Sequence, residues 1–179
     1  MSIDDVLLFW FDEIEPAQWW KKDDAFDQAL RARFAALQRR AAQCELYGWR
    51  SSGRGRLAEV IVLDQFSRNL FRGDARAFAC DPLALGLAQT ALELGVDQSL
   101  SPVERSFLYM PFMHSESLAI HDVGIGLFER LAIKENFDSA LKHRAIIERF
   151  GRYPHRNPML GRVSTAEEVE FLGQPGSGF

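Results

Sequence analysis

The feature that most constrains the fold is a long stretch in which apolar residues recur every three or four positions. Between Asp23 and Leu46 these positions hold Phe26, Leu30, Phe34, Leu37, Ala41 and Cys44. Such spacing puts the side chains on one face of an α-helix, whereas a half-buried strand alternates every second residue. Gly48 follows where such a helix would end. We therefore predict an amphipathic helix over residues 23–46.

The same spacing recurs along the rest of the chain, separated by signals for helix ends. The stretch 56–70 is apolar almost all round and is expected to be the central helix of the domain. Further helices are expected from Ser2, over 81–95, from Ser101 to Pro111, over 117–131, over 138–150 and over 164–173. No Asn-Gly or Asp-Gly turn lies between alternating strands. The predicted fold class is all-α, with stacked antiparallel helical hairpins and no sequence repeat of about 34 residues.

Particular residues set the expected helix boundaries. Asp81 precedes a proline, as a capping acid does at a helix start. Two serine and glutamate pairs, at 101/104 and 164/167, have the spacing of a capping box. Pro111 has no amide hydrogen and is expected to kink or end its helix near residue 110. The backbone freed there is expected to aim the polar side chains that follow.

Length, composition and charge narrow the class of protein. The chain has 179 residues, of which 47% are hydrophobic and 26% charged, which suits one packed helical domain over 1–179. The net charge of -4 argues against bulk binding to nucleic acid or membrane. Cys44 and Cys80 lie in no metal-ligand pattern and are expected to be buried. Because the N-terminus has no basic signal region, a cytoplasmic protein is expected.

Positive charge is nonetheless concentrated in one segment. Residues 134–162 hold seven Lys or Arg against three acids, a local charge of +4. Within this segment the loop 151–158 carries Arg152, His155 and Arg156. Guanidinium groups bind carboxylate or phosphate through paired hydrogen bonds, so Arg152 and Arg156 are candidate ligand-binding residues, and His155 beside them is a third. RNA is a weaker candidate because nothing beyond Tyr153 provides a stacking aromatic ring.

The central helix carries charge on an apolar face. At 100° per residue Asp64 and Arg68 share a stripe with apolar neighbours, and Asn69 lies beside them. A carboxylate and a guanidinium are costly to bury unless they are bonded, so we predict one bonded network. The network either docks neighbouring helices or forms the floor of a ligand site. In the second case all three residues are candidate ligand-binding residues.

Three further residues are candidates for proton transfer. His114 and Glu116 follow the expected break at Pro111 and are expected to meet at one point, as a general acid and base require. Capping or docking is the structural alternative for both. His143 faces inward on its helix, either as a structural donor or as a catalyst. The 114/116 spacing is not that of a helical metal pair, so neither a metal nor another cofactor is expected.

Longer motifs give the chain a family resemblance. They occupy residues 56–58, 63–73 (LDQFSRNLFRG), 77–79, 104–105, 107–116 (FLYMPFMHSE), 143–144, 149–157 (RFGRYPHRN) and 160–162. In these motifs the sequence resembles the uncharacterised bacterial family catalogued as domain of unknown function 924. The resemblance implies an all-helical, tetratricopeptide-like fold and supplies no activity. Ser67 stands where that family more often has proline, so the central helix is expected to be straighter.

Two hypotheses of function follow, from different classes. In the first, the 114–116 segment and the 151–158 loop face one cleft over the Asp64 helix and bind a small anionic metabolite, with or without catalysis. In the second, the protein is a helical adaptor for another protein and the polar motifs are structural. A cleft lined by the named residues favours the first, and an exposed apolar groove without them favours the second. The sequence leaves the oligomeric state open.

Overall fold

The computed structural model describes residues 1–178, and every regular element among them is helical. The α-helices are α1 (Ile3–Leu8), α2 (Asp24–Ala42), α3 (Gly53–Ile61), α4 (Ser67–Leu70), α5 (Asp81–Glu93), α6 (Pro102–His114), α7 (Leu118–Leu131), α8 (Lys134–Phe150) and α9 (Ala166–Leu172). The all-α class is confirmed, while the tetratricopeptide-like hairpins and the single domain remain predictions. No helix in this part of the chain has the length and apolar character needed to cross a membrane.

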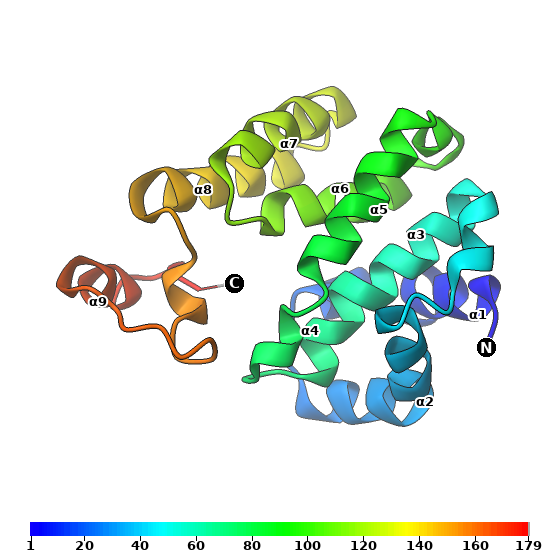
Figure 1. The fold of residues 1–179 in the computed structure, drawn as a ribbon, viewed down its shortest axis with the longest axis horizontal. Helices are drawn as coiled ribbons and strands as arrows, with labels where there is room; N and C mark the ends of the chain where they lie inside the picture. The colour runs from blue at the N-terminus through cyan, green and yellow to red at the C-terminus, as the bar shows by residue number, and fades with distance from the viewer. Residues whose placement is uncertain (179) are drawn as a thin grey trace.

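The helices pack around α3 and α6, which cross the interior (Figure 1). α3 contacts α1, α5 and α6, and α6 also contacts α7 and α8. α7 and α8 lie side by side, whereas α9 stands at the end of the molecule opposite α1. The main apolar core draws on α1 through α8. A smaller cluster of Ile146, Ile147 and Tyr153 contacts Phe171, so it docks α9 on α8.

α3, the π turn η4 (Val62–Phe66) and α4 form one continuous helix, because the residues at both junctions have right-handed helical dihedral angles. Most of its side chains are buried, as predicted for residues 56–70. The absence of proline at Ser67 does not make the helix regular, since the π turn lies directly before that residue. A π turn adds a residue to one helical turn and is frequent at functional sites. This one contains Asp64 and Gln65.

Pro111 lies inside α6 and does not end it. The helix continues to His114, and the chain becomes extended at Ser115. Every residue from Ser106 to Met113 is buried, and this packing offsets the backbone hydrogen bond that a proline removes. The predicted helix end near residue 110 is therefore wrong, while the alternative of a kink at Pro111 stays a prediction. The helix ends at His114, three residues after Pro111, so the chain changes direction between His114 and Glu116.

Three predictions about helix ends and cysteines are also corrected. α2 stops at Ala42, and Cys44 takes a left-handed φ of 59°, a conformation that ends helices. Cys44 is therefore exposed, while Cys80 is half-buried. α8 begins at Lys134, before the predicted start at residue 138.

One capping box is confirmed and the other is displaced. Ser101 Oγ accepts from the Glu104 amide at 3.3 Å, and the Glu104 carboxylate accepts from the Ser101 amide at 2.8 Å. At α9 the box is Thr165 with Glu168, one residue later than predicted. The predicted pair 164/167 and the observed pair 165/168 both have the spacing of a capping box in the sequence. The later one is used because Glu168 also accepts from Arg152, at 2.7 Å.

Candidate functional site

A carboxylate in the π turn organises the candidate site. Asp64 is fully buried, and its Oδ1 lies 2.9 Å from Arg68 Nη1 and 2.7 Å from His114 Nδ1. Gln65 Nε2 donates to Oδ2 at 2.5 Å. Burial alone would raise the pKa of Asp64, but the charge of Arg68 and the hydrogen bonds with His114 and Gln65 outweigh it and hold that pKa well below its usual range. The predicted pairing of Asp64 with Arg68 is therefore present in the structure.

A second carboxylate, Asp81, joins two arginines. Arg68 donates to both of its oxygens at 3.0 Å, and Arg156 Nη1 donates to Oδ2 at 3.2 Å. Asp81 is the first residue of α5, whose N-cap is Cys80, so its predicted capping role is wrong. The sequence did not predict that Asp81 joins two arginines, because Arg68 and Arg156 lie 13 and 75 residues from it along the chain. No local spacing links residues at such separations.

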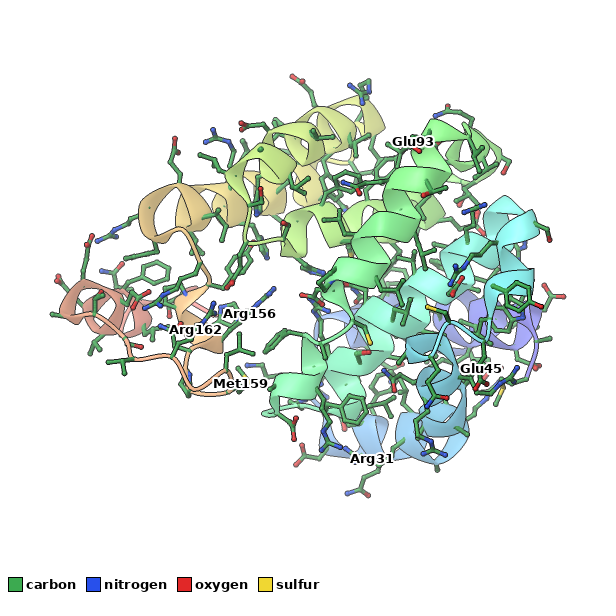
Figure 2. All side chains as sticks on the ribbon, in the orientation of Figure 1. Arg31, Glu45, Glu93, Arg156, Met159 and Arg162 are labelled. Carbon is green, nitrogen blue, oxygen red and sulfur yellow. The ribbon has the colours of Figure 1, made fainter. Side chains whose placement is uncertain are left out.

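Arg156 extends from the short helix η7 (Pro154–Arg156) toward the centre of the molecule (Figure 2). Its side chain is 7% exposed, and its guanidinium lies 4.5 Å from the ring centres of both Phe78 and Tyr153. Nη2 donates to the His114 carbonyl at 3.0 Å, whereas Nε has no hydrogen-bond partner among the described residues. Burial lowers the pKa of Arg156, and Asp81 opposes that effect. An arginine remains charged in proteins, so this is a buried cation with a donor to spare.

Three histidines lie around these charges. Burial lowers the pKa of all three, that of His143 to about 3 and that of His155 to about 4. The charge of Arg68 lowers the pKa of His114 further, and the charge of Arg156 lowers that of His155. All three imidazoles are therefore neutral at pH 7. His143 Nδ1 lies 2.7 Å from the Ser139 carbonyl. Because Asp64 engages Nδ1 of His114, Nε2 is the nitrogen of that ring left to meet a ligand. Within residues 1–178 no group of three or more His, Cys, Asp or Glu side chains is placed to hold a metal ion.

These groups line one cavity of about 1040 Å³. The predicted site residues on its wall are Arg68, Asn69, His114, His143, His155 and Arg156. They come from the central helix, the end of α6, α8 and η7. The end of α6 and the loop after α8 thus face the same space above the Asp64 helix, as the first sequence hypothesis expects. Buried Asp64 lies behind this wall, bonded to two of its members.

Besides Asp64, two predicted site residues lie outside the cavity wall. Glu116 accepts from Arg162 at 2.7 and 2.9 Å, so it does not meet His114 as a general acid or base. Arg152 donates to Glu168 at 2.7 and 2.8 Å and helps to hold α9. Asn69 is on the wall, but its side-chain amide donates to the carboxylate of Asp27 on α2 at 2.9 Å. Glu116 and Arg152 thus make contacts that hold parts of the fold together, as in the hypothesis that the polar motifs are structural.

Sequence reasoning missed the apolar part of the cavity. Trp20 and Val103 line it and are 63% and 43% exposed, although tryptophans are core residues by default. Phe107 and Met110 line it from α6. The signal that could have found this wall is the helical spacing of 103, 107, 110 and 114, which places one face of α6 along it.

Comparisons with other proteins identify relatives. Residues 6–176 match the family described as bacterial protein of unknown function (DUF924). The solved structure of a protein of unknown function from Agrobacterium tumefaciens is similar, with 41% sequence identity and a TM-score of 0.90. That similarity covers 95% of this chain and 96% of the other. Among curated proteins no match is found.

Proposed function

The chain belongs to the bacterial protein family of unknown function DUF924, and we propose that its cavity binds a small anionic ligand through a carboxylate or phosphate group. One observation carries the proposal. Arg156 is a buried cation on the cavity wall, and its Nε has no hydrogen-bond partner among residues 1–178. A buried donor left unpaired is costly, and a ligand oxygen would satisfy it. Guanidinium groups are suited to both carboxylate and phosphate.

The charge on the cavity wall supports the same ligand class. Of the described residues that line it, one is acidic, Glu135, and five are basic: Lys21, Lys22, Arg68, Arg72 and Arg156. Basic groups around a concave site raise the local concentration of anions. Asp64 and Asp81 offset part of this charge from behind the wall.

His114 is the residue best placed to move a proton in such a site. A buried carboxylate orients its imidazole through Nδ1, at 2.7 Å, and the ring lines the cavity. A neutral imidazole held in this way can accept a proton through Nε2. His143, whose ring centre is 6.4 Å from that of His114, is a second candidate. Proton transfer is thus part of the proposal for these two residues.

The lining of the cavity favours a ligand site over a helical adaptor. Charged and imidazole groups reach its wall, whereas a groove that docks another protein through apolar contacts needs no buried cation at its base. A cytoplasmic location belongs to the proposal as well, because both cysteines are free thiols.

Arg156→Gln is expected to weaken anion binding by roughly tenfold or more, since a hydrogen bond to a charged group contributes about 1.5–3 kcal/mol. Isothermal titration with sodium phosphate and with sodium butanoate, at constant ionic strength set by chloride, measures the dissociation constants. Titration is preferred to melting curves alone, because phosphate also stabilises folded proteins without binding a site.

Arg144→Gln is the matched control. Arg144 lies on α8 and pairs with Asp122 and Glu148 on the surface, so this change is expected to leave the affinity unaltered. Equal affinity in wild type and the Arg156 variant, or equal weakening by both substitutions, would contradict a site at Arg156.

A further inference from the structure

We infer that the ligand is an amphiphilic monocarboxylate, with its carboxylate at Arg156 and an apolar chain laid along α6. This inference rests on the proposed function and names the ligand class. It follows from three observations: the length of the cavity wall, the change in polarity along it, and the balance of charge at its polar end.

The cavity wall on α6 is longer than a small anion needs. Along one face of α6 it runs through Val103, Phe107, Met110 and Met113 to His114. At about 1.5 Å per residue, this stretch of α6 is roughly 16 Å long. A phosphate or acetate would contact one end of it. A cavity of about 1040 Å³ has room for a much larger molecule.

Polarity changes from one end of this wall to the other. Near the start of α6, Val103 and Trp20 line the cavity while remaining 43% and 63% exposed. The Trp20 ring stacks on Phe107, with centroids 6.1 Å apart and planes 9° apart. At the other end of this wall, the end of α6 contacts Arg156, whose Nη2 donates to the His114 carbonyl at 3.0 Å. Apolar surface and a charged anchor therefore occupy opposite ends of the same wall.

The ion-pair network that contains Arg156 favours a ligand with a single negative charge. Arg68 and Arg156 face two carboxylates, Asp64 and Asp81, which leaves the four groups balanced. The surrounding histidines are neutral at pH 7 because burial lowers their pKa values. A monoanion would use the unpaired Nε of Arg156. A phosphate dianion would bring a second charge close to Asp81, and that repulsion disfavours it.

A series of straight-chain carboxylates tests the inference. Titrations of the full chain with butanoate, octanoate and dodecanoate, below their micelle concentrations, are expected to show roughly three- to fourfold tighter binding per added methylene until the wall is covered. Dodecanol, which has the chain without the charge, is expected to bind at least tenfold more weakly than dodecanoate. Arg156→Gln is expected to remove that difference.

Val103→Glu tests the position of the chain. It places a charge at the apolar end, at the N-terminus of a helix where acids are tolerated, so folding is expected to be kept. Dodecanoate should bind at least tenfold more weakly, and butanoate equally well. Val123→Glu is the matched control, because Val123 is 51% exposed on α7 and is not among the residues lining the cavity, and it should change neither.

The outcomes separate this inference from the proposed function. Butanoate binding that depends on Arg156, with no gain from a longer chain, would overturn the inference and leave the anion site standing. A gain with chain length that Val103→Glu does not reduce, or equal binding of dodecanol and dodecanoate, would also overturn it. Absence of binding by phosphate and by every carboxylate would overturn both.

Discussion

Asp64→Ala is expected to lower the free energy of unfolding by about 3–5 kcal/mol, the largest effect of any single change considered for this chain. The substitution leaves the Arg68 guanidinium and the His114 ring in the interior without the carboxylate that both contact, at 2.9 and 2.7 Å. Arg68 keeps its salt bridge to Asp81, at 3.0 Å, but Arg156 shares that carboxylate, so the charge of Arg68 is only partly neutralised. Gln65 loses its acceptor as well. Arg68→Ala is expected to have a similar effect, because it strands Asp64.

Chemical denaturation and melting curves measure this loss. For a domain of this size, the expected change corresponds to a fall in melting temperature of roughly 6–20 °C. Asp74→Ala is the matched control: Asp74 pairs with Arg76 at 2.9 Å on the surface, with side chains 41% and 66% exposed, and because solvent screens such a pair its removal should lower the stability far less than the loss of Asp64. Unchanged stability in both the Asp64 and Arg68 variants would show that the buried network contributes nothing to folding.

Acidification from pH 7 to pH 5 is expected to cost roughly 2–4 kcal/mol of stability through His143 and His155 alone. In the folded protein burial lowers the pKa of these residues to about 3 and about 4. In the unfolded chain a histidine titrates near pH 6.5. The unfolded state therefore binds more protons as the pH falls through this window, and stability is lost with them. Burial also lowers the pKa of His114 and His121, which adds to the loss.

Urea denaturation at pH 7, 6 and 5 measures the effect. The buried carboxylates of Asp64 and Glu168 contribute little over this range, because their pKa values lie far below it. The double variant His143→Gln, His155→Gln is expected to lose clearly less stability between pH 7 and pH 5 than wild type, whatever its stability at pH 7. Equal losses in the two proteins would mean that these two histidines do not resist protonation in the folded state.

The candidate site divides into parts that local spacing predicts and parts that it does not. Asp64 and Arg68 are one helical turn apart, so their pairing follows from the helix period. The prediction of Glu116 as a partner of His114 relied on nearness in sequence, and it is not supported, because Arg162 takes both of its oxygens. A short separation brings two side chains together only when the backbone between them keeps a regular period.

The sequence by itself determined the helical class, the apolar central helix, the capping box at residue 101 and the pairing of Asp64 with Arg68. These features depend on spacings within one helix or one turn, and the period of an α-helix converts such spacings directly into shared faces. The tertiary structure alone decided that Asp81 joins Arg68 to Arg156, that Arg152 holds α9, and that Trp20 and Val103 face the same cavity as His114. Those contacts join segments far apart in the chain, and they depend on how whole helices dock, which is set by the packing of many side chains at once.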